Sequence, residues 1–184
     1  MNIEAVNYLN IFLGVGAIAL QVFSFGAVFL LFFRINGNKD NKYLDFIKNH
    51  FLILGFSITF LSSVFPLVYS EIIHFLPCYL CWWQRVFMFP LVFIFGIALW
   101  DKDKKIIRYT LPLLLAGFLV SLYQNFFYYF GENSNIPCDA SGVSCYQRLV
   151  SVFGGYISIP MLALTAFFSL LAILLVAHFY KKEV

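Results

Sequence analysis

Residues 77–85 read Pro-Cys-Tyr-Leu-Cys-Trp-Trp-Gln-Arg, and they lead from a polar connection into a long apolar run. The stretch places a Cys-x-x-Cys pair, Cys78 and Cys81, at the expected start of a helix. A thiol at a helix N-terminus lies near the positive end of the helix dipole and near unpaired N–H groups, which favour the thiolate. Arg85 follows Cys81 by one helical turn on the same face, where its charge stabilises an anion. The pattern predicts a redox-active dithiol where an apolar helix begins.

The composition of the whole chain is that of a membrane protein. Of the 184 residues, 62% are hydrophobic and 11% are charged, whereas soluble domains have roughly 45–50% and 25%. Five apolar runs, at about residues 8–33, 51–70, 82–100, 109–130 and 156–180, each approach the ~20 residues that cross a bilayer. We therefore predict an all-α integral membrane protein with five spans, folded as a single membrane domain over residues 1–184.

The positive charges predict how these spans are oriented. Ten of the twelve lysines and arginines lie in the connections at 34–48 and 101–108 or in the C-terminal tail, and such an excess marks cytoplasmic segments. The connections at 71–81 and 131–155 then face outwards, with the N-terminus outside and the C-terminus inside. All four cysteines lie on this extracytoplasmic side, where disulfides persist. The charges are spread over short loops, so we expect no nucleic-acid partner.

The four cysteines form two local pairs, Cys78/Cys81 and Cys138/Cys145. The second pair encloses a small polar loop with Gly142, an accessible setting for thiol–disulfide exchange. Disulfides that merely staple the outer loops are one alternative, but a crosslink with such short spacing at a helix start adds little, because its entropic benefit grows with loop length. A tetrahedral zinc site is another alternative, and an oxidising outer face argues against it.

These motifs resemble the DsbB family of membrane disulfide-generating oxidoreductases, in particular its shorter, BdbC-type members. The resemblance is carried by CYLCWWQR at 78–85, LVYSEIIHFLP before it, PCDASGVSC at 137–145 and YISIPMLALTAF at 156–167. It implies a DsbB-like four-helix bundle over residues 51–180. The helix at 8–33 is extra to that plan, and we expect its Gln21 at a helix–helix contact.

The resemblance also implies an activity. It implies a multi-pass protein of the bacterial cytoplasmic (inner) membrane that reoxidises a DsbA-like thioredoxin-fold protein and passes the electrons to a membrane quinone, either ubiquinone or menaquinone. Cys138 then forms the mixed disulfide with the partner, Cys145 is its mate, Cys78 exchanges with this loop pair, and Cys81 attacks the quinone. Arg85 matches the family arginine beside the quinone, and snorkelling to lipid headgroups is its alternative.

Three further residues are expected near the quinone. Gln124 stands where many relatives carry a histidine, and an amide inside a span needs a polar partner; a quinone carbonyl and a neighbouring helix are both open. Ile159 and Met161 flank Pro160 and complete an apolar pocket wall in this prediction, with core packing as the alternative.

Two other functions are weighed against this one. A quinone reductase resembling vitamin K epoxide reductase shares the chemistry, but in those enzymes the loop pair precedes the helix-start pair, whereas here Cys78/Cys81 comes first. The other is a non-catalytic membrane assembly protein with disulfide-stapled loops. A bound quinone excludes the second alternative.

Overall fold

Five long helices make up the computed structural model of the protein, which describes residues 3–35, 41–74, 76–130 and 152–180. They are α1 (Ile3–Ile35), α2 (Lys42–Leu67), α3 (Tyr79–Asp101), α4 (Ile107–Phe130) and α5 (Ile159–Phe179). A short π-helix, η1 (Val68–Ile72), continues α2, and a 3-10 turn, η2 (Lys104–Ile106), leads into α4. All five helices are long and apolar enough to cross a membrane. The predicted all-α membrane fold with five spans is confirmed.

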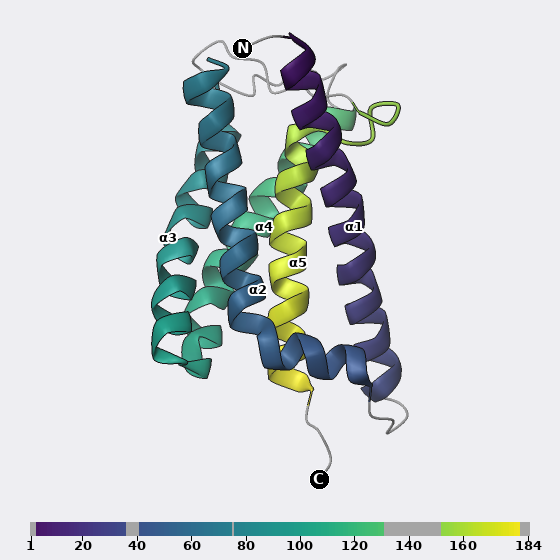
Figure 1. The fold of residues 1–184 in the computed structure, drawn as a ribbon, viewed down its shortest axis with the longest axis vertical. Helices are drawn as coiled ribbons and strands as arrows, with labels where there is room; N and C mark the ends of the chain where they lie inside the picture. Colours follow the sequence, from purple (N-terminus) through teal and green to yellow (C-terminus); the bar gives the residue numbers. More distant parts are fainter. Residues whose placement is uncertain (1–2, 36–40, 75, 131–151, 181–184) are drawn as a thin grey trace.

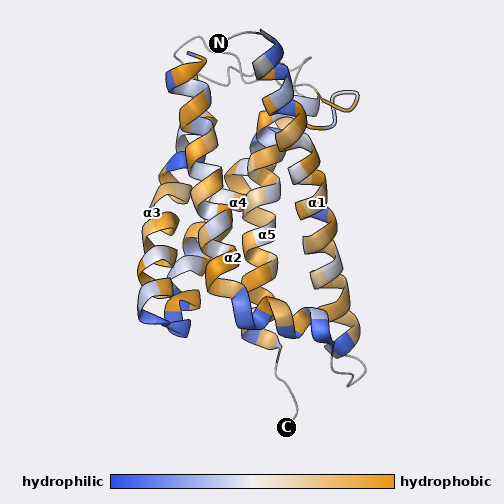
Figure 2. Cartoon of the chain, in the orientation of Figure 1, coloured by the Kyte–Doolittle hydropathy of each residue, from blue (hydrophilic) through white to orange (hydrophobic). Residues whose placement is uncertain are grey.

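The helix α5 is the central element of the bundle. It packs against α1, α2 and α4, while α3 packs against α2 and α4, and Figure 1 shows α5 between α1 and α2. About 61% of the most apolar part of α5 is buried, against 22–28% for the other four helices. Figure 2 shows apolar residues along the middle of the helices and hydrophilic residues gathered towards their ends. The outer helices therefore turn most of their surface to lipid.

Two glycines allow aromatic rings to pack between helices. A Cβ added to Gly117 of α4 would lie 2.2 Å from the Phe167 ring of α5, and one added to Gly55 of α2 would lie 2.3 Å from the Phe95 ring of α3. Both rings are fully buried. Because real Cβ atoms do not approach so closely, glycine is required at both positions for this packing.

Polar side chains fasten α1 to α5. Gln21 Nε2 donates a hydrogen bond to Thr165 Oγ1 at 2.8 Å, and Ser24 Oγ donates to Ser169 Oγ at 2.7 Å. The hydroxyl of Tyr156, just before α5, donates to Gln21 Oε1 at 3.0 Å. Such bonds fix the register between helices in an apolar environment. The predicted helix–helix contact of Gln21 is confirmed.

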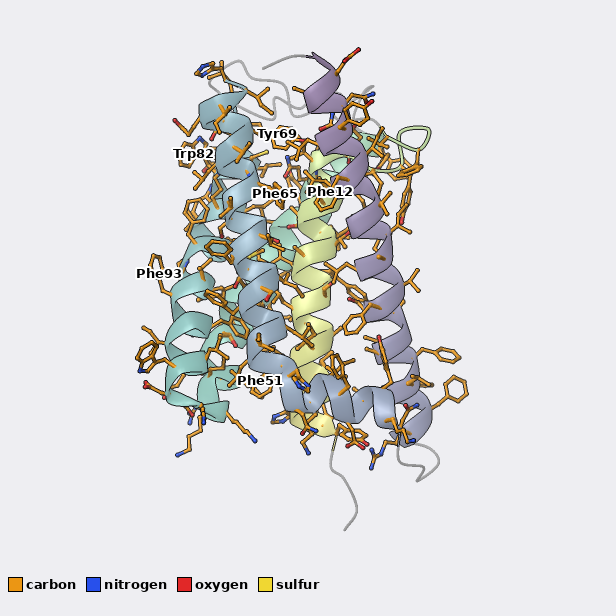
Figure 3. All side chains as sticks on the ribbon, in the orientation of Figure 1. Phe12, Phe51, Phe65, Tyr69, Trp82 and Phe93 are labelled. Carbon is orange, nitrogen blue, oxygen red and sulfur yellow. The ribbon has the colours of Figure 1, made fainter. Side chains whose placement is uncertain are left out.

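The second helix begins at Lys42, earlier than the apolar run that we placed at 51–70. Asn41 caps its first turn, and Leu44 and Ile47 are buried, whereas the charged residues Lys42, Asp45 and Lys48 alternate with them along the chain. This amphipathic start lies across the lower end of the bundle in Figure 1, and the helix then turns near Phe51, which Figure 3 labels. Hydropathy alone missed the segment because its outward face is charged.

Candidate dithiol site

The Cys-x-x-Cys pair lies at the start of α3, as the sequence predicted. Cys78 is the N-cap residue with extended backbone angles, and Cys81 lies in the first turn. The two Sγ atoms are 3.1 Å apart, and both cysteines are free. Cys78 is buried, whereas Cys81 is partly exposed. Small side-chain movements from this separation bring the sulfurs to bonding distance, so the pair suits reversible disulfide formation.

An amide from α4 contacts both sulfur atoms. Gln124 Nε2 donates to Cys78 Sγ at 3.3 Å and to Cys81 Sγ at 3.2 Å. Its Oε1 accepts a hydrogen bond of 2.6 Å from Gln84 Nε2 of α3. Gln124 is 1% exposed. Because Gln84 binds the amide oxygen, the amide nitrogen must face the sulfurs, and an N–H donor there favours a thiolate.

Cys78 lies just before the membrane-spanning part of α3. The hydrogen bond with Cys81, and then burial, raise the pKa of the Cys78 thiol well above its ordinary value. A raised pKa favours the protonated form of Cys78, in which its S–H can donate to the Cys81 sulfur. This bond, with that of Gln124, stabilises negative charge on the Cys81 sulfur.

The side chain of Arg85 extends from α3 to the neighbouring helix α2. Its Nη2 donates to the Pro66 carbonyl oxygen at 2.8 Å, and its Cζ lies 5.2 Å from the centre of the Trp82 ring. The side chain is only 8% exposed. Directly after Pro66 and Leu67 the helix widens into η1, a π-helical turn of the kind that often occurs at functional sites. This orientation favours a site residue over one that snorkels.

A cavity of about 400 Å³ lies beside Cys81 and Arg85. Its walls come from α1, α2, α3 and α5 and are mostly apolar, and Cys81, Gln84 and Arg85 supply polar groups on the α3 side. Figure 3 shows Phe12 of α1 and Phe65 of α2 in the space between these two helices, and both line the cavity. The volume falls in the range of roughly 300–1,000 Å³ typical of small-molecule sites.

Of the other predicted site residues, only Ile159 lies in the wall of this cavity within the described part of the chain. Ile159 lines the cavity, whereas Met161 and Gln124 are not among the described residues of its wall. Gln124 instead contacts the sulfurs, so its predicted contact with a quinone stays a prediction, as does that of Met161. Cys138 and Cys145 lie outside the described residues.

Sequence reasoning missed three contributors to the site. Gln84 lies inside the quoted motif, three residues after Cys81, and this helical spacing was the available signal. Tyr69 of η1 lines the cavity and donates a hydrogen bond to Asn10 Oδ1 of α1. An asparagine within an apolar run was the signal for that contact. The third contributor is α1, which lines the cavity. Nothing in the motif at residues 77–85 indicated this contribution.

The fold and this site define a multi-pass membrane protein with a hydrogen-bonded dithiol beside an apolar cavity. The family model for "Disulfide bond formation protein DsbB" matches residues 48–177. The chain therefore belongs to the DsbB family of disulfide bond formation proteins, and its class of activity is that of a membrane disulfide oxidoreductase.

Curated relatives agree with the family match. Disulfide bond formation protein C of Bacillus subtilis (strain 168) is 35% identical over 133 residues, which cover 72% of this chain and 96% of the relative. Probable disulfide formation protein C 2 of Bacillus anthracis is 32% identical over 140 residues, covering 76% and 99%. Probable disulfide formation protein of Chlamydia caviae is 34% identical, with the same coverage. No solved structure matches the chain significantly.

The contact of Gln124 with the sulfurs leads to a prediction for Gln124→Leu. Loss of a hydrogen bond to a charged group costs about 1.5–3 kcal/mol, so alkylation of Cys81 by iodoacetamide at neutral pH should slow about tenfold or more. The rate is measured on reduced protein by mass spectrometry. Asn125→Leu is the matched control, because Asn125 donates to the Ser121 and Pro160 carbonyls and not to sulfur. Equal rates in wild type and Gln124→Leu would contradict the prediction.

Proposed function

We propose that the protein is a quinone-dependent thiol:disulfide oxidoreductase of the bacterial cytoplasmic membrane. It takes two electrons from a reduced, DsbA-like thioredoxin-fold protein and passes them to ubiquinone or menaquinone. The observation that carries the proposal is the shared apolar cavity of Cys81 and Arg85 beside the hydrogen-bonded dithiol. Membership of the DsbB family supports the disulfide chemistry, and the quinone and the partner are our extension of it.

Two disulfide exchanges connect the partner to the dithiol. A partner thiolate attacks Cys138 of the Cys138–Cys145 disulfide, and the second partner thiol resolves the mixed disulfide, leaving both loop cysteines reduced. The loop pair then reduces the Cys78–Cys81 disulfide and is itself reoxidised. Finally the Cys78/Cys81 disulfide re-forms as two electrons and two protons pass to the quinone. The net reaction converts partner dithiol and quinone into partner disulfide and hydroquinone.

The residues around Cys81 suit the last of these steps. Cys81 borders the cavity while Cys78 is buried behind it, so one sulfur meets a lipid-soluble acceptor and the other resolves. Gln124 and Arg85 stabilise the Cys81 thiolate, and Arg85 also offers N–H donors to negative charge that develops on a quinone oxygen. The apolar walls fit an aromatic ring and exclude water.

We propose that the dithiol end of the bundle faces the extracytoplasmic side. Lys102 ends α3, whose first residues carry the dithiol, so it lies at the opposite end of the helix. Figure 1 shows that this end of α3 and the beginning of α2, with Lys42, are at the same end of the bundle. Positive residues at that end support a cytoplasmic location for it.

The test uses purified protein in lipid with a reduced thioredoxin-fold oxidase and decyl-ubiquinone, without oxygen. We expect loss of partner thiols and formation of hydroquinone in equal amounts, and alkylation of the four cysteines should fall after quinone is added to reduced protein. Unchanged alkylation would favour the non-catalytic alternative. Hydroquinone formation with a small dithiol such as dithiothreitol, but none with the thioredoxin-fold oxidase, would favour the reductase alternative.

A further inference from the structure

The cavity beside the dithiol has a wall outside the family match. The helix α1 spans Ile3–Ile35, whereas the family model begins at residue 48. The relative from Bacillus anthracis is covered over 99% of its length by an alignment that takes in 76% of this chain. One face of α1 nevertheless lines the cavity, through Phe12, Leu13, Gly16, Ala17 and Leu20. The extra helix is thus part of the cavity as well as of the bundle.

The helix α1 is attached to its neighbours on either side of the stretch that lines the cavity. Within the described residues, α1 packs mainly against α5 and only slightly against α2. The bond between Asn10 and Tyr69 joins α1 to η1 near one end of the cavity, and the bond between Gln21 and Thr165 joins α1 to α5 further along. Along this stretch both helices line the cavity, α1 through Phe12 and Gly16 and α2 through Phe65. Beyond it the Tyr43 hydroxyl of α2 donates to the Phe23 carbonyl oxygen of α1 at 2.7 Å.

Gly16 lies at an open part of this wall. A Cβ added at Gly16 meets no atom within 4 Å, whereas one added at Gly14 lies 3.1 Å from the Phe153 ring. Gly16 lines the cavity and is also exposed. A residue that is both exposed and part of the wall lies where the cavity meets the surrounding hydrocarbon.

We propose that α1 forms the tail side of the quinone site. The ring lies against Cys81 and Arg85, and the isoprenoid tail leaves between α1 and α2 across Gly16. The apolar side chains of Phe12 and Phe65 border this path, so a hydrocarbon tail is accommodated there without burying unpaired polar groups. This inference rests on the proposed function, and it adds that the extra helix makes the site prefer quinones with a tail.

The test compares Gly16→Leu with Gly26→Leu. The second change is matched, because a Cβ at Gly26 meets only the Tyr43 hydroxyl at 4.0 Å and Gly26 does not line the cavity beside the dithiol. Two probes share one ring: decyl-ubiquinone carries a tail, and 2,3-dimethoxy-5-methylbenzoquinone has none. Gly16→Leu should raise KM for the tailed probe about tenfold, with kcat retained and KM for the tailless probe changed less than about twofold. Gly26→Leu should change neither.

Other results of these KM measurements would overturn the tail path or the proposed function. An unchanged KM for the tailed probe in Gly16→Leu overturns the tail path, and so does an equal rise for both probes, which places α1 against the ring. A wild-type protein that reduces neither probe overturns the proposed function together with this inference. If Gly16→Leu does not fold, Gly16→Ala serves instead and should give a smaller rise for the tailed probe alone.

Discussion

Replacing Cys81 by serine is expected to abolish quinone reduction by the reduced partner, with a fall of at least about 1,000-fold in turnover. Serine forms no disulfide, and its hydroxyl does not ionise at neutral pH, so the cavity loses the thiolate that gives up electrons. The sulfur lies 3.1 Å from Cys78 Sγ and borders the cavity, and no other described cysteine does. The rate is followed as hydroquinone formation under anaerobic conditions.

Cys78→Ser is the matched control for this change. It also removes the disulfide and stops turnover, but it keeps Cys81, Arg85 and the cavity wall, so decyl-ubiquinone should still bind and protect Cys81 from alkylation. The combination separates loss of chemistry from loss of binding. More than a tenth of the wild-type rate in Cys81→Ser would contradict the assigned role of Cys81.

Local sequence patterns were enough to predict the parts of the site that lie on one helix. The Cys-x-x-Cys motif after Pro77 predicted a helix start, and the structure has one with Cys78 as its N-cap. The four-residue spacing from Cys81 to Arg85 predicted a shared face, and both residues line the same cavity. Backbone geometry within one helix is enough to place such neighbours.

Contacts between different helices could not be predicted from those local patterns. The bond from Gln84 to Gln124 joins residues 40 positions apart, and it depends on how α3 and α4 are rotated against each other. Hydropathy could not distinguish the cavity-facing residues of α1, such as Gly16, from its lipid-facing residues, because both environments are apolar. The amphipathic start of α2 was missed because its charges mask the buried Leu44 and Ile47.

Replacing Arg85 by alanine is expected to raise KM for decyl-ubiquinone about 10- to 100-fold. This is the effect of losing a charge-assisted hydrogen bond worth about 1.5–3 kcal/mol. The change also removes the bond to the Pro66 carbonyl, so thermal unfolding must be measured beside the kinetics. Arg85→Lys should recover part of the affinity, because it restores the charge without the planar group of N–H donors.

The comparison between the two variants decides what Arg85 does. If the bond to Pro66 were its main contribution, lysine and alanine would lower the unfolding temperature while KM stayed near the wild-type value. If Arg85 snorkelled to headgroups, neither KM nor the rate of Cys81 alkylation would change. A site role instead requires that Arg85→Ala raises KM for decyl-ubiquinone and also slows the alkylation of Cys81. Both effects are expected because the guanidinium then stabilises the Cys81 thiolate as well as the bound acceptor.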